Sequence, residues 1–187
     1  TLGFRRWRLR INPDGDEPPR LEGLVRFGWR EELRCLWDLP GPTRAKCMRR
    51  KLKPGFACEA HGEVPGASCS CGFYAYGLRD DSNSETTALL VGGVVAGWGD
   101  VELHEGGFRC AVAKVLALFA PDPAKRHSDY GGKARKNWAA LERMCTENAI
   151  PLLAPEALRE DEEVRRYAHE RDLALLEDQL NASVRTW

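Results

Sequence analysis

The stretch ACEAHGEVPGASCSCGFYAYG, residues 57–77, decides how we expect this chain to fold. It holds three cysteines and one histidine among glycines and a proline, and it ends in a short aromatic run. Soft ligands this close together in irregular chain are typical of a structural zinc site, in which four sulfur or nitrogen atoms surround the metal. We therefore predict a zinc knuckle within residues 47–71, followed by a β-strand over residues 72–78.

Five side chains are candidates for the four ligand positions of this knuckle: Cys47, Cys58, His61, Cys69 and Cys71. The spacing alone leaves either Cys47 or Cys58 as the spare residue. A catalytic zinc site of the deaminase type is disfavoured, because that motif needs C-x-x-C and this chain has Cys69-x-Cys71. The alternative to a metal site is a set of buried or adventitious thiols.

The composition predicts one domain that spans all 187 residues, of which 43% are hydrophobic. Basic and acidic residues balance at 28 each, which argues against indiscriminate binding of polyanions. Their distribution is uneven: fourteen basic and seven acidic residues give residues 1–53 a net charge of +7, and four basic and nine acidic residues give residues 156–181 a net charge of −5. The basic part either pairs with the acidic part or faces a polyanion such as nucleic acid.

The cysteines and the hydropathy pattern indicate where in the cell we expect the protein. Seven cysteines in clusters fit a metal site in a reducing cytoplasm better than a secreted disulfide scaffold. No apolar run approaches the roughly 18 residues of a membrane helix, and the chain opens with the basic TLGFRRWRLR rather than with a signal peptide. We expect a cytoplasmic protein that does not contact a membrane.

Strands dominate the first two thirds of the chain. Period-two alternation and turn residues predict strands over residues 3–11, 21–29, 72–78 and 106–120, and two more strands within 86–105. Residues 30–39 are predicted as a short helix or helical turn, and the chain from there to Cys71 as irregular.

The last third has helical periodicity. A helix over residues 134–149 places Trp138, Leu141 and Cys145 on one face, and a second helix is expected over residues 156–180. The predicted class is α+β: a small, strongly bent β-sheet or barrel with a zinc knuckle and C-terminal helices. Residues 1–120 are mainly β, 121–133 form a loop, and 134–182 are helical.

A second unusual stretch, GWGDVELHEGGFRC at residues 97–110, gathers polar and aromatic side chains around glycines. One interpretation is a ligand pocket, in which Trp98 stacks on the ligand and His104 or Arg109 forms hydrogen bonds with it. The other is a tight hairpin with a packed Trp98 and a surface ion pair between Glu105 and Arg109. The basic strand FRRWRLR adds Trp7 as a candidate for stacking on a base.

Several motifs together resemble a known family. They are G-F-R-x-W-R-L near the start, P-G-P-T-R-A-K-C at 40–47, His61 followed by Pro65, C-S-C-G-F-Y-A-Y at 69–76, and V-A-G-W-G-D-V-E-L-H-E-G-G-F-R at 95–109. The chain resembles, over roughly residues 3–120, a family of small uncharacterised actinobacterial proteins with the pattern A-x-C, H-x-x-P, C-x-C-G-[IL]-Y-A and W-G-x-V-x-x-H-x-x-G-[FY]-R.

The resemblance implies a ligand set but no activity. It matches Cys47, His61, Cys69 and Cys71 to the metal ligands, which makes Cys58 the extra cysteine. The chain departs from the pattern by having Cys58, by a longer segment between Cys47 and His61, and by Cys110 where the pattern leads us to expect alanine. The choice between Cys47 and Cys58 stays open.

Three functions are consistent with these observations. The first, which we favour, is a zinc-stabilised binding module for nucleic acid or a nucleotide-like ligand, with Trp98, His104, Arg109 and Trp7 at the site. The second is a small enzyme with His104 or Glu105 as general base and Arg109 holding an anion. The third is a protein-interaction or homo-oligomeric assembly module without a pocket.

Overall fold

The structure is a computed structural model that describes residues 1–12, 17–23, 35–46, 64–66, 71–77, 90–121, 131–154 and 166, with only the backbone of 131–135. By its internal contacts the chain divides into Thr1–Ala154 and Pro155–Trp187. All strands described and the helix belong to the first unit, and of the second unit only Arg166 is described. The predicted single domain and the predicted helix over 156–180 stay predictions.

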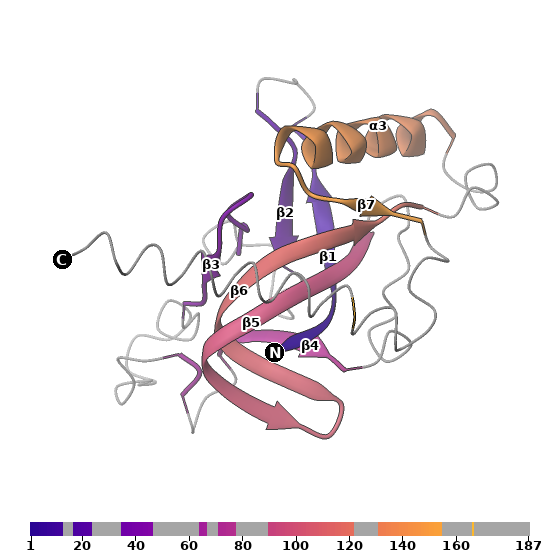
Figure 1. The fold of residues 1–187 in the computed structure, drawn as a ribbon. Coiled ribbons are helices and arrows are strands. Elements are labelled where there is room, and N and C mark those ends of the chain that lie inside the picture. Colours follow the sequence, from indigo (N-terminus) through magenta and orange to yellow (C-terminus); the bar gives the residue numbers. More distant parts are fainter. Residues whose placement is uncertain are drawn as a thin grey trace. The chain divides into compact units, whose positions relative to one another are not determined.

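A bent, mainly antiparallel sheet forms the first unit (Figure 1). The described residues supply seven strands, and only the pairing of β6 with β7 is parallel. The strands are β1 (Leu2–Arg10), β2 (Arg20–Gly23), β3 (Thr43–Arg44), β4 (Phe73–Tyr76), β5 (Leu90–His104), β6 (Gly107–Phe119) and β7 (Leu152–Leu153). This confirms a strongly bent sheet as the main element of the fold.

Strand β6 is the centre of the sheet. It pairs with β5 over most of its length, and its other edge pairs in turn with β4, β3 and β7. Strand β1 pairs with β5 from Leu2 to Arg8, and through a single pair, Phe4 with Tyr76, it also meets β4. Pairing on both edges, with cover on both faces, explains why residues 108–113 and 115–119 are all buried.

Two predictions for the β region are wrong in detail. The residues of 86–105 that the structure describes form one long strand, β5, and not two, because register shifts at Val94/Val95 and Trp98/Val101 bend it without ending it. The predicted helix over 30–39 is wrong for residues 35–39, where Leu36 bridges to Glu22 and Trp37 N–H donates to the Leu21 carbonyl.

The irregular segment predicted after residue 39 also contains a strand. Thr43 and Arg44 form β3, which adds to the edge of β6 opposite Ala113 and Val112. Thr43 also accepts a hydrogen bond from the Asp38 N–H through its hydroxyl, which fixes the turn before the strand. Two-residue strands carry no alternation pattern, so the sequence gives no local sign of this one.

Helix α3 (Gly131–Glu147) confirms the first predicted helix. Trp138, Leu141 and Cys145 are all buried, as their helical spacing predicts. The helix ends where Ala149 adopts a positive φ and the Ile150 N–H donates to the Cys145 carbonyl, before Pro151. No helix in the described part of the chain is both long enough and apolar enough to cross a membrane.

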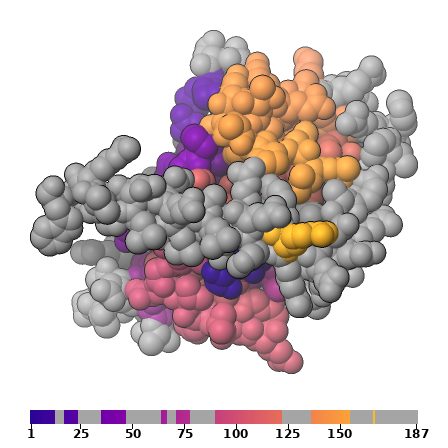
Figure 2. Space-filling model, viewed as in Figure 1, coloured from indigo at the N-terminus to yellow at the C-terminus, as the bar shows by residue number. Residues whose placement is uncertain are grey.

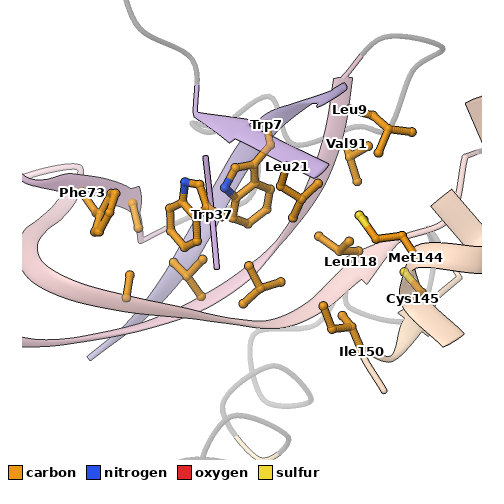
Figure 3. Close-up of a cluster of buried hydrophobic side chains, with 14 of the residues drawn as sticks. Trp7, Leu9, Leu21, Trp37, Phe73, Val91, Leu118, Met144, Cys145 and Ile150 are labelled. Atoms are coloured by element: carbon orange, nitrogen blue, oxygen red, sulfur yellow. The ribbon is translucent and has the colours of Figure 1, made fainter. Parts of the chain in front are cut away.

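The core lies between the sheet and α3. Figure 3 shows Met144, Cys145 and Ile150 facing Leu118 and Val91, with the indole rings of Trp7 and Trp37 further along the sheet. Trp7 and Trp37 meet edge to face at 5.2 Å between ring centroids, and Phe73 lies 4.7 Å beyond Trp37. The hairpin of β5 and β6 projects from the end of the sheet opposite to α3, where it forms part of the molecular surface (Figures 1 and 2).

Candidate functional site

The candidate site is a row of side chains across the outer face of three strands. Tyr74 on β4 pairs in register with Arg109 on β6, and Arg109 pairs with Glu102 on β5. Residues paired in register point to the same face of a sheet, so these three side chains lie side by side. His104 is two residues beyond Glu102 and joins the same face.

A bulge sets this register. Between Trp98 and Val101, two residues of β5 stand opposite one residue of β6, and Gly99 in the bulge has a φ of 76°. A glycine with positive φ is typical of this kind of bulge, because other residues are strained there. Without the extra residue, Arg109 would face Val101 instead of Glu102. The regular alternation of side chains along β5 is therefore interrupted between Trp98 and Val101.

Arg109 is the buried centre of the row. Only 4% of its surface is exposed, and its Nε donates to the Glu102 carboxylate at 2.9 Å, with Nη2 on the same oxygen. The ion pair expected with Glu105 is thus formed with Glu102, because Glu105 lies in the turn beyond the paired residues. Desolvation opposes the charge of Arg109, but its hydrogen bonds with Glu102 and Tyr74 outweigh that cost and raise its pKa above the ordinary value.

Arg109 also joins the sheet to the predicted zinc knuckle. Its Nη1 donates to the Cys71 carbonyl and its Nη2 to the Gly66 carbonyl, both at 3.4 Å. The Gly66 N–H in turn donates to the Cys71 sulfur at 3.4 Å. These hydrogen bonds tie the backbone around Gly66 and Cys71 to strand β6.

Cys71 is the one predicted metal ligand that the structure describes. Cys47, Cys58, His61 and Cys69 lie outside the described residues, so the ligand set stays a prediction. Among the residues described, no three His, Cys, Asp or Glu side chains are grouped to hold a metal ion. The hydrogen bond to its sulfur and its burial fit Cys71 as a zinc ligand.

Two aromatic rings form the exposed part of the site. The His104 and Tyr74 rings are stacked at 6.3 Å between centroids and 12° between planes. His104 Nε2 lies 3.7 Å from Glu102 Oε1, and the His104 and Glu102 side chains are 42% and 43% exposed. Tyr76, on the same face of β4 as Tyr74, is also exposed. The arrangement places two parallel, partly exposed aromatic rings beside a carboxylate.

The other predicted site residues lie elsewhere. Trp7 has no exposed surface and packs against Trp37, so it is not presented to a base at the surface. Trp98 is half-buried, pairs with Val112 before the bulge, and makes no described contact with the row. Glu105 is exposed in the hairpin turn. The structure therefore brings His104 and Arg109 together and separates them from Trp7 and Trp98.

Sequence reasoning missed Tyr74, Tyr76 and Glu102. The alternation in FYAY does place both tyrosines on one face, opposite the buried Phe73 and Ala75. The pairing of β4 with β6 joins segments more than thirty residues apart, and no local pattern predicts it. Comparisons with protein-family models, with curated proteins and with solved structures gave no match.

Proposed function

We propose that this chain is a zinc-stabilised binding module for a planar, nucleobase-like ligand, which stacks on the Tyr74 and His104 rings. The observation that carries the proposal is the parallel pair of half-exposed rings on a sheet face. Aromatic side chains on exposed sheet faces bind bases by stacking, and the interaction tolerates different bases because each has a π face. Tyr76 extends the aromatic surface along β4.

Glu102 supplies the polar contact of the proposed site. One carboxylate oxygen is held by Arg109, and the other lies on the side of His104, where it can accept hydrogen bonds from an exocyclic amino group. Because Arg109 is held by Glu102 and by two backbone carbonyls, it positions the carboxylate and is not available to bind a phosphate.

The charge around the rings favours a base or nucleoside over a nucleic-acid backbone. Asp100 and Glu105, two and three residues from Glu102 along the chain, are exposed, and the charge of Glu102 is balanced by Arg109. The described residues of this hairpin therefore add negative charge, which disfavours phosphate groups. Nucleic acid remains the alternative ligand, because the first 53 residues carry a net charge of +7.

Zinc in this proposal is structural. The knuckle would hold the Gly66 and Cys71 carbonyls in place for Arg109, and Arg109 would hold Glu102. Cys47, His61, Cys69 and Cys71 are the proposed ligands, with Cys58 as the alternative to Cys47. Closed sites of this kind stabilise the fold and take no part in chemistry.

Titration of the four nucleosides and of a short single-stranded oligonucleotide, followed by NMR and calorimetry, tests the proposed ligand. We expect nucleoside binding that hardly depends on salt and that weakens by about 1–3 kcal/mol, roughly 5- to 150-fold, in Tyr74→Ala and His104→Ala. Leu103→Ala is the matched control, because Leu103 is exposed on the same strand and its side chain points to the opposite face.

The other outcomes separate the alternatives. Tighter binding of the oligonucleotide, with an affinity that falls steeply as salt increases, would identify nucleic acid as the ligand. Equal weakening in Leu103→Ala and Tyr74→Ala, or no binding of either ligand to the wild-type protein, would contradict the proposed site.

A further inference from the structure

The two oxygens of the Glu102 carboxylate are used differently. Arg109 donates to Oε2 from both Nε and Nη2, so the two lone pairs of this oxygen are occupied. Oε1 accepts no hydrogen bond from the part of the chain that the structure describes, because His104 Nε2, at 3.7 Å, lies beyond hydrogen-bond distance. One oxygen with two free lone pairs is therefore left for a ligand.

The position of this carboxylate is fixed before a ligand arrives. Arg109, which is 4% exposed, donates to the carbonyls of Gly66 and Cys71 as well as to Glu102. The Glu102 side chain is thereby held at one oxygen, although 43% of it is exposed. An acceptor that is already ordered loses less conformational entropy when the ligand binds.

The free oxygen borders the proposed stacking surface. Oε1 lies beside the His104 ring, and that ring is parallel to Tyr74 with 6.3 Å between the centroids. The three side chains share one face of the sheet. A base that stacks on these rings therefore has the carboxylate at one of its polar edges, where single-stranded bases are recognised by hydrogen bonds.

The bases differ in what they offer to a single carboxylate oxygen. Guanine carries its N1–H and its N2 amino group side by side, and the two lone pairs of one oxygen can accept both hydrogens. Adenine and cytosine each offer one amino group next to a ring nitrogen whose lone pair repels the carboxylate. Uracil offers one N–H between two carbonyl oxygens, which also repel it. Because hydrogen bonds to a charged acceptor are the strong ones, the second donor of guanine decides the order.

We propose that the site selects guanine, whose N1–H and N2 amino group donate to Glu102 Oε1 while the base stacks on Tyr74 and His104. The selectivity rests on the proposed function, because it needs a base on those two rings. The rings supply affinity for any base, and Glu102 determines which base is bound.

Titration of the wild-type protein with guanosine and its analogues, followed by NMR and calorimetry, tests the selectivity. Inosine lacks the N2 amino group and 1-methylguanosine lacks the N1–H, so each should bind about 10-fold or more weakly than guanosine. Adenosine and cytidine should also bind more weakly, and uridine most weakly of all. Equal affinities for guanosine, inosine and uridine would overturn the guanine selectivity and leave the stacking site in place. Absence of binding by every nucleoside would contradict the stacking site as well.

Glu102→Gln tests the residue that makes the choice. Arg109 can only donate, so it holds the carbonyl oxygen of the new amide and turns the amide NH₂ to the position of Oε1. A donor there opposes both donors of guanine, and the preference for guanosine over adenosine should disappear while both nucleosides still bind. Glu105→Gln removes the same charge from the exposed hairpin turn and should keep the preference.

A guanosine preference that survives in Glu102→Gln, with an unchanged circular dichroism spectrum, would overturn the proposal. A preference lost equally in Glu105→Gln would do the same, because it would show a general effect of charge. If Glu102→Gln does not fold, the affinities of the wild-type protein for guanosine, inosine and 1-methylguanosine decide the question.

Discussion

The imidazole ring of His104 stacks on the phenol ring of Tyr74, although strand β6 lies between the strands that carry them. The β6 residue that pairs with both His104 and Tyr76 is Gly107. An added Cβ at Gly107 would overlap the Ala75 carbonyl oxygen, so the lack of a side chain lets β4 lie this close to β6 and brings Tyr74 within reach of His104. The aromatic surface thus depends on one glycine as much as on the rings themselves.

Gly107→Ala should strongly destabilise the protein. Gly107 has a φ of 155°, and an added Cβ would overlap the Ala75 carbonyl oxygen and the Tyr76 backbone. We expect a loss of about 3 kcal/mol or more in the free energy of unfolding, measured by urea denaturation. Gly106→Ala is the control, since a Cβ there meets no atom within 4 Å. Similar stabilities for the two variants would contradict the pairing of β4 with β6.

Glu102→Ala should cost more stability than Glu105→Ala. Removing Glu102 leaves Arg109, whose side chain is 5% exposed, without its counter-charge. Because Glu102 itself is half-exposed, we expect a loss of about 2 kcal/mol, below the range for fully buried pairs. Glu105→Ala should change the free energy of unfolding by less than about 0.5 kcal/mol. A larger loss of stability in Glu105→Ala than in Glu102→Ala would indicate that Arg109 pairs with Glu105, as one interpretation of the sequence has it.

Metal analysis tests the knuckle directly. We expect about one zinc per chain in the wild-type protein and none in Cys71→Ala, with a marked fall in Tm on chelation. Cys145→Ala should retain the metal, because Cys145 lies on the core-facing side of α3. Cys47→Ala and Cys58→Ala, measured separately, would identify the fourth ligand. Metal-free wild-type protein prepared without chelator would exclude the zinc knuckle.

Stability should decrease between about pH 9 and 11. Burial raises the pKa of the Cys110 thiol from 9.0 to about 11, so the unfolded chain loses this proton at a lower pH than the folded protein. The folded state then binds more protons, and its stability falls as pH rises through this window, by at most about 1.4 kcal/mol per pH unit for this thiol.

Cys110→Ala isolates the contribution of this thiol. Its urea midpoint should fall less steeply than that of the wild-type protein above pH 9, whereas below pH 8 the two curves should run parallel. Cys145→Ala should show the same behaviour, because burial also raises the pKa of Cys145 to about 11. Parallel curves over the whole alkaline range would show that neither thiol titrates differently in the folded and unfolded states.

The parts of the fold that local patterns determine were predictable. Strand β4 follows from alternation, β6 from a long apolar run after a glycine turn, and helix α3 from helical spacing, each within its own residues. Residues 35–39 were predicted as part of a short helix or helical turn, but they pair with β2, and that pairing is set by the rest of the sheet. Tertiary pairing overrides local preference in such segments.

The candidate site was only half predictable. His104 and Arg109 stand out because they lie in an unusual glycine-rich motif, but their partners depend on register. A single bulge at Gly99 decides that Arg109 meets Glu102, and the pairing of distant strands decides that His104 meets Tyr74. The sequence shows the glycine, but not which residues it brings into register.

The pairing of β1 with β5 also has a consequence for the speed of folding. Leu2 meets Ala96, and β5 in turn needs β6, so the edge of β1 that pairs with β5 stays unpaired until about two thirds of the chain is in place, although β2 pairs locally with the other edge. Chains dominated by such distant pairings fold in milliseconds to seconds, far more slowly than helical bundles. Hydrogen exchange should accordingly be slowest in β6, and a chain that ends before Gly107 should leave unprotected the β1 amides that face β5.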